Sequence, residues 1–137
     1  MRFLLAAIVA WAIAQVAKVL ISSFQLRRLN LRVLADPGGM PSSHSAIVMG
    51  LTTAIGKYAG ITSAAFAIAL IFSFVVMYDA AGVRRAAGRQ AAVLNRVVQD
   101  LVHMRGMQEA ELRELLGHTP VEVLIGAVLG IAVGLIL

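Results

Sequence analysis

Three short polar segments hold the residue types that could carry out acid–base or phosphoryl-transfer chemistry. The stretch 38–45 combines glycines and hydroxyls with His44, Asp79 follows a long apolar run, and His118 lies four residues before Glu122. A histidine can act as an acid, a base or a nucleophile near neutral pH, and a carboxylate four residues along a helix can orient its ring. Glycines and hydroxyls at a helix start leave N–H groups available to an anion.

Helix capping accounts for part of the same pattern. Ser42 or Ser43 can cap a helix that begins there, because a hydroxyl accepts a bond from the first turn. Thr119, with a proline after it and Glu122 three residues later, matches a capping box. Capping does not account for His118, and a capped helix start still offers N–H groups to an anion.

Asp79 ends an apolar run, where a helix dipole disfavours a negative charge. Three roles therefore stay open for it: capping the next helix, pairing with Arg84 or Arg85, or serving a site. The arginines could bind phosphate in bidentate fashion, although topological charge and contact with lipid headgroups explain most of them.

The composition is that of an integral membrane protein. Of 137 residues, 60% are hydrophobic and only 14% are charged, which is too apolar for an ordinary soluble domain. We expect one all-α transmembrane domain, residues 1–137, built as a helical bundle with a polar, amphipathic helical segment at 79–117. Its four expected transmembrane spans cover residues 3–24, 42–58, 61–78 and 120–137. The chain has no cysteine and hence no disulfide or thiolate metal site.

The basic residues predict the orientation of these spans. Only Arg2 and Lys57 belong to one side, whereas the loops at 25–40 and 79–117 of the other side hold Arg27, Arg28, Arg32, Arg84, Arg85, Arg89, Arg96, Arg105 and Arg113. The positive-inside rule places these basic loops in the cytoplasm and the protein in the inner membrane. We expect the basic face to contact anionic lipid headgroups and not nucleic acid. His44, Asp79 and His118 would then share the cytoplasmic face.

Two further features concern the spans themselves. Lys18 lies near the end of the first run, on a face shared with Gln15 and Trp11. It can snorkel to the interface, but the polar face favours a cation that reaches a site at this end. The fourth run carries small residues at four-residue spacing, and this stripe fits a homodimer and intramolecular packing equally well: Gly126, Gly130 and Gly134.

Nearly the whole chain resembles the divergent branch of the type 2 phosphatidic acid phosphatase superfamily, which is related to the vanadium-dependent haloperoxidases. The segments that carry the resemblance are 39–46 (GMPSSHSA), 78–85 (YDAAGVRR) and 117–123 (GHTPVEV). The superfamily is a helical bundle that hydrolyses phosphomonoesters or diphosphates without a metal. The resemblance implies the same fold and chemistry here.

The resemblance also implies roles for individual residues. His44 would be the general acid, His118 the nucleophile that forms a phosphohistidine, and Glu122 would hold its other ring nitrogen. Ser43 stands where the superfamily has glycine, and Glu122 where it has aspartate. Asp79 belongs to the second matching segment. The cations that would bind phosphate match only in part, and the candidates are Lys18, Arg84, Arg85 and Arg113, beside Ser42 and Ser43.

Three functions are consistent with these residues. The first is a membrane phosphatase or phosphotransferase that acts on a lipid phosphate or diphosphate through a phosphohistidine and needs no cofactor. The second is a non-catalytic protein that binds anionic lipid or a partner through its basic face. The third is a metal-dependent phosphohydrolase with a divalent ion among Asp79, Glu122, His44 and His118. The glycine- and hydroxyl-rich loop fits phosphate better than a metal, so the metal enzyme ranks third.

Overall fold

The structure, a computed structural model, describes residues 1–34, 38–105 and 117–137, and the side chains of all of these except 84, 85 and 100–105. Within those ranges the chain is helical and has no strand, which confirms the expected all-α bundle. The elements are α1 (Arg2–Leu26), η1 (Arg32–Leu34), α2 (Ser43–Ala59), α3 (Ala64–Tyr78), η2 (Asp79–Val83), α4 (Arg84–Arg105) and α5 (Pro120–Ile136). Here η1 is a 3₁₀ turn and η2 a π-helical turn.

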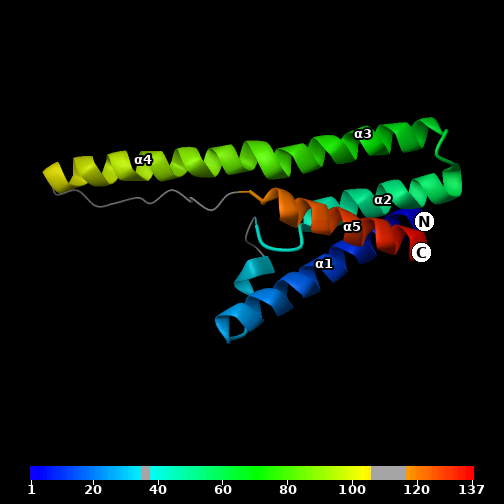
Figure 1. Cartoon of the computed structure of the whole chain (residues 1–137), viewed down its shortest axis with the longest axis horizontal. Coiled ribbons are helices and arrows are strands. Elements are labelled where there is room, and N and C mark those ends of the chain that lie inside the picture. The colour runs from blue at the N-terminus through cyan, green and yellow to red at the C-terminus, as the bar shows by residue number, and fades with distance from the viewer. Residues whose placement is uncertain (35–37, 106–116) are drawn as a thin grey trace.

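Helix α2 is the centre of the bundle and packs against α1, α3 and α5. Figure 1 shows α2 and α5 running in one direction, while α1 and α3 run in the other. The starts of α2 and α5 therefore lie at the same end of the bundle as the end of α3. Both chain termini lie at the opposite end.

The helices meet through their smallest side chains. The buried face of α1 consists of Ala6, Ala7, Ala10 and Ala14, followed by Lys18. Large apolar side chains such as Ile8, Ile68 and Phe74 point outward and are more than half exposed. A soluble protein would bury such side chains, whereas a protein in a bilayer packs small residues between helices and presents large ones to lipid.

Helix lengths agree with a membrane location. Helix α1 and the helical stretch Ala64–Gln99 are each long and apolar enough to cross a bilayer, and α5 is a shorter apolar helix. With the outward-facing apolar side chains, this makes the protein an integral membrane protein. The number of four spans and their bounds remain predictions.

The glycines at four-residue spacing on α5 pack against α2 of the same chain. A Cβ on Gly126 would overlap the carbonyl oxygen of Ser42, and a Cβ on Gly130 would overlap that of Ala46. At Gly134 the nearest atom, the Cβ of Thr53, would be 2.6 Å away. Glycine lets the backbones of α5 and α2 touch. The stripe is thus buried within one chain and leaves no free face for a second copy.

Helix α3 ends at Tyr78, but the helical path continues through Asp79, contrary to the sequence-based expectation of a helix C-terminus there. Asp79 has helical torsions (φ −57°, ψ −49°), and the π-turn η2 carries the chain into α4 without a loop. A π-turn accommodates an extra residue without breaking the helix. Asp79 therefore lies inside a helix and not at a helix end, so the dipole argument for its role does not apply. Figure 1 shows α4 continuing α3 well beyond the rest of the bundle.

Helix α2 continues to Ala59, and Gly60 begins the turn to α3 with φ +91°. Within the polar segment expected at 79–117, residues 106–116, including Arg113, lie outside the described residues.

Candidate functional site

The start of α2 is built around Ser42. Its hydroxyl caps the helix by accepting a bond from the Ser45 N–H (3.4 Å), as the sequence suggested, and also from the Ser45 hydroxyl (3.2 Å). Ser42 is fully buried and Ser43 nearly so. The Ser42 hydroxyl is thus committed to the cap. The anion-binding capacity of this start rests on first-turn N–H groups such as that of Ser43, because the first turn of a helix has no internal acceptors for them.

The start of α5 combines the two roles that the sequence left open for Glu122. Thr119 and Glu122 form a reciprocal capping box, in which the Thr119 N–H donates to Glu122 Oε2 (3.0 Å) and the Glu122 N–H to Thr119 Oγ1 (3.3 Å). The same Oε2 lies 3.2 Å from Nδ1 of His118. One carboxylate therefore caps the helix and holds the imidazole.

This contact fixes the tautomer of His118. A carboxylate can only accept a hydrogen bond, so Nδ1 carries the proton and Nε2 of the neutral ring carries the lone pair. The His118 side chain is 2% exposed and that of Glu122 is 22% exposed. The negative charge of Glu122 also stabilises positive charge on the ring. The arrangement suits Nε2 to attack an electrophile.

Backbone hydrogen bonds tie three elements together at this point. The Ser42 N–H donates to the Glu122 carbonyl (3.0 Å), which joins the start of α2 to α5. The His118 N–H donates to the Ala80 carbonyl (2.9 Å), which joins α5 to η2. The His44 and His118 rings then meet edge to face, with 5.9 Å between their centroids. Two imidazoles that are 74 residues apart in sequence thus share one site.

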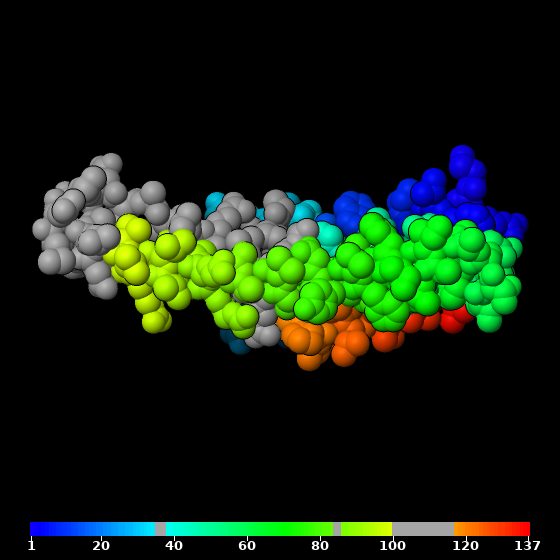
Figure 2. Space-filling view, turned by 90° about the horizontal axis from the view of Figure 1, so that it is seen from above, coloured from blue at the N-terminus to red at the C-terminus, as the bar shows by residue number. Residues whose placement is uncertain are grey.

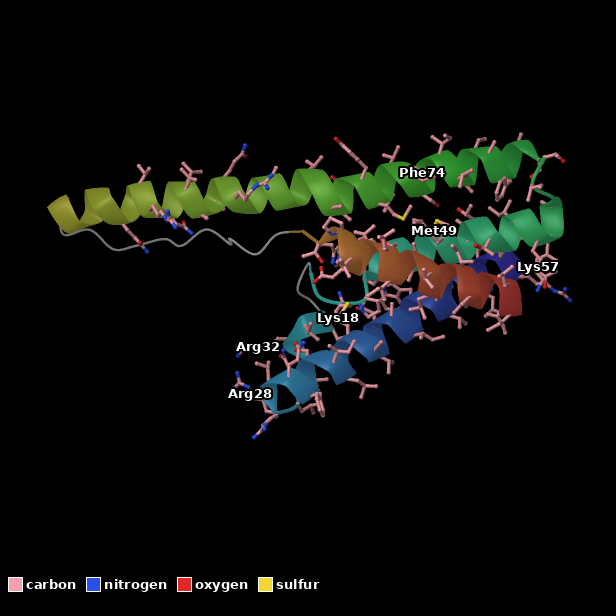
Figure 3. All side chains as sticks on the ribbon, viewed as in Figure 1. Lys18, Arg28, Arg32, Met49, Lys57 and Phe74 are labelled. Carbon is pink, nitrogen blue, oxygen red and sulfur yellow. The ribbon has the colours of Figure 1, made fainter. Side chains whose placement is uncertain are left out.

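Lys18 belongs to the same end of the bundle. It continues the alanine face of α1 and is 4% exposed. A Cβ on Gly39 would lie 3.4 Å from Lys18 Cγ, so the lysine stem runs along the glycine loop. Figure 3 shows Lys18 beside this loop, far from Lys57 at the opposite end. Trp11, expected on the same face as Lys18, is 44% exposed and points elsewhere.

The remaining candidate residues are located by their positions in the chain. Asp79 is partly buried in η2, next to the Ala80 carbonyl that receives His118. Arg84 and Arg85 open α4 directly after η2, but their side chains, like the whole of Arg113, lie outside the described part of the chain. Among the residues that the structure describes, no three histidine or carboxylate side chains form a group that could hold a metal ion.

Sequence reasoning missed the residues that act through their backbone or their small size. Ala80 supplies a carbonyl, Gly39 makes room for Lys18, and Gly126 lets α5 reach Ser42. Only Gly126 left a signal, because it begins a four-residue glycine repeat. A carbonyl partner or a close approach to a loop leaves no pattern in a single sequence.

Comparisons with known proteins agree with these observations. A family model described as the divergent PAP2 family matches residues 1–133. A relative from Bacillus subtilis, named as the uncharacterized membrane protein YuiD, is 42% identical over 147 residues, which cover 98% of this chain and 92% of the relative. No solved structure matches.

Proposed function

Because the chain belongs to the divergent PAP2 family, we propose that it is a membrane phosphatase or phosphotransferase that acts on a lipid phosphate or diphosphate. The observation that carries the proposal is the Nδ1 contact of buried His118 with Glu122, which leaves Nε2 as a nucleophile. Capping alone would explain Glu122 but gives no reason for a second imidazole, that of the half-buried His44, with its ring centroid 5.9 Å from that of His118.

The proposed reaction has two displacement steps. Nε2 of His118 attacks phosphorus in line with the leaving oxygen, so an N–P bond forms as the P–O bond breaks. His44 donates a proton to the leaving oxygen. Water then attacks the phosphohistidine, His44 takes up a proton from it, and phosphate leaves from the regenerated His118. A second alcohol in place of water would make the reaction a phosphotransfer.

The negative charge of the phosphoryl group needs compensation at the start of α2. N–H groups of the first turn and the positive end of its dipole face this point, and Lys18 adds a cation beside Gly39. Glu122 offsets the positive charge that develops on His118. The proposal therefore assigns binding to Lys18 and the α2 start, and bond making to the two histidines.

The test is phosphate release by the purified protein in detergent. The substrates are phosphatidate, phosphatidylglycerol phosphate, and polyprenyl phosphates and diphosphates, each with and without chelator. We expect release that survives chelator, falls at least about 10³-fold in His118→Ala and about 10²-fold in His44→Ala, and is unchanged in the histidine control His103→Ala on α4. Acid-labile, base-stable label from a ³²P substrate should be trapped on the wild-type chain only.

The other outcomes distinguish the alternatives. Release that disappears with chelator and returns with a divalent ion would replace the phosphohistidine reaction with metal-assisted hydrolysis. Full release by His118→Ala would overturn the assignment of the nucleophile. No release from any substrate, combined with binding to anionic vesicles that weakens with salt, would identify a non-catalytic lipid-binding protein.

A further inference from the structure

We propose that the outer side of α4 docks onto a second copy of this chain as a parallel coiled coil. This surface is named here the α4 seam, and it consists of Val83, the last residue of η2, and of Ala87, Gln90, Leu94 and Val97 in α4. All five side chains are exposed, and the three large apolar ones are Val83 (57%), Leu94 (52%) and Val97 (49%). The proposal is independent of the chemistry at His118.

The spacing of the seam is typical of a coiled coil. Successive members are separated by four, three, four and three residues, which is a repeat of 3.5 residues. Two helices that supercoil around each other present a face with this period. Over two heptads an amphipathic helix on a flat surface shows the same spacing, so the direction of α4 has to distinguish the two. The single polar member, Gln90, is compatible with a coiled-coil core, where one polar position sets the register.

The charges of α4 lie off the seam. Arg89 and Arg96 are both exposed and both fall two residues after a seam apolar position, at the c position of the heptad. Between Val83 and Val97 the positions beside the seam are Arg84, Ala86, Ala91 and Val93, and Arg84 is the charged one among them. In a parallel pair an e position faces a g position of the other helix, so Arg84 of one copy does not face Arg84 of the other, and the copies can join along the seam without pairing like charges.

The direction of α4 favours a second copy over the membrane surface. Helix α4 continues α3 through η2 and has 22 residues, which corresponds to about 33 Å at 1.5 Å per residue. Because α3 belongs to the bundle and α4 continues it, this length projects out of the bundle (Figure 1). If α3 spans the bilayer, α4 therefore points away from the membrane surface, and copies inserted with the same topology carry their α4 helices in parallel.

The uncovered surface extends from α4 back along α3. A shallow apolar groove on α3 is lined by Phe74, Val75, Met77 and Tyr78, one helical turn before Val83. Figure 2 shows α3 and the described part of α4 uncovered along one side. The α5 glycine stripe, the other candidate for self-association, is already filled by α2. The outer faces of α1 and α5 are also apolar and exposed, and the long helix differs from them because it continues beyond the bundle.

Single cysteines test the proposal directly, because the natural chain has none. Leu94→Cys and Val97→Cys would lie at the coil axis, whereas Arg89→Cys and Arg96→Cys, on the same helix, would lie away from it. We expect oxidation in native membranes to link at least half of the seam variants into dimers and less than a tenth of the off-seam variants. Adding Leu94→Asp to Val97→Cys should reduce the dimer at least fivefold.

Each other outcome contradicts the proposal. Equal cross-linking at all four positions would indicate random collision. No dimer, together with seam cysteines protected from a water-soluble maleimide, would place the helix against lipid. Cross-linked species with the mass of a different protein would identify another partner. The folded state of each variant is checked by its elution from size-exclusion chromatography in detergent.

Discussion

His118 owes its geometry to a carboxylate that has two tasks. Glu122 accepts from the Thr119 N–H as part of the cap and from Nδ1 of His118 as part of the site. The first task needs only an oxygen acceptor, which glutamine also provides. The second needs a negative charge, because the ring becomes positive during the proposed reaction. The two tasks can therefore be separated by substitution.

Glu122→Gln should keep the cap and weaken the chemistry. We expect kcat for phosphate release to fall about 10²-fold, while the free energy of unfolding changes by less than about 1 kcal/mol. Glu122→Ala should lower both kcat and the free energy of unfolding, because it also removes the oxygen that accepts from the Thr119 N–H. Steady-state kinetics and thermal unfolding in detergent measure the two effects. Wild-type kcat in Glu122→Gln would show that the carboxylate serves the cap alone.

The sequence was informative about residues that act through their side chains. The spacing of His118 and Glu122 and a cap at Ser42 or Ser43 followed from local pattern, and the grouping of His44, Asp79 and His118 at one end followed from the alternation of the expected spans. The sequence did not correctly predict which side of α1 Lys18 shares with its neighbours. Its three-residue spacing from Gln15 is compatible with more than one choice of the side that packs against the bundle. The alanines at 10 and 14, and not Trp11, mark the side of α1 that faces the bundle.

At the scale of the elements, the contact between α2 and α5 depends on the absence of side chains. A Cβ at Gly126 would meet the Ser42 carbonyl oxygen, in the residue whose N–H bonds to Glu122. Any displacement of α5 at this point moves Glu122 and His118 relative to His44. Packing and site geometry are therefore linked through one glycine.

Gly126→Ala should destabilise the bundle by about 1–3 kcal/mol and lower phosphate release at least tenfold. The matched control is Gly82→Ala, where the new methyl group would make only ordinary contact with the Tyr78 ring, at 3.9 Å and 4.0 Å. The control should be neutral or slightly stabilising, since alanine favours helices by about 1 kcal/mol over glycine. Thermal unfolding and turnover of both variants check this. Equal stability of the two variants would contradict the close contact.

The helical bundle was predictable because apolar runs of membrane length are a strong signal. The continuity of α3 and α4 was not predictable, because Asp79 and Gly82 resemble a helix stop and a π-turn has no sequence signature of its own. The use of the α5 glycines was also open, since a small-residue stripe fits a helix of the same chain or of another. The choice between these partners is made by three-dimensional packing alone.

At the scale of the whole molecule, charge is distributed unequally between the two ends. The end that holds the candidate site carries Arg27, Arg28 and Arg32, whereas Arg2 and Lys57 lie at the end with the termini. At that second end, both cations lie over the Tyr58 ring, at 5.2 Å and 5.0 Å from its centroid. This asymmetry predicts that the site faces the cytoplasm.

Labelling of single cysteines in intact cells measures this orientation. Leu29→Cys follows α1 at the site end, and Thr62→Cys lies in the turn between α2 and α3 at the other end; both positions are exposed and neither substitution alters the charge. A membrane-impermeant maleimide should label Thr62→Cys in intact cells and Leu29→Cys only after permeabilisation. The reverse pattern would place the site outside the cytoplasm.

The packing of this bundle inverts the usual relation between side-chain size and tolerance to substitution. Most of the buried residues in the described part of the chain are alanine, glycine, serine and threonine, joined by a few valines such as Val133, and most of its bulky apolar side chains face outward. Exchange of one large apolar residue for another on the outside alters little, because lipid chains adapt to either shape. Addition of one methylene group inside forces two backbones apart. A saturation mutagenesis map of this protein should therefore show its most constrained positions at its smallest residues, and drift among relatives should concentrate at its largest.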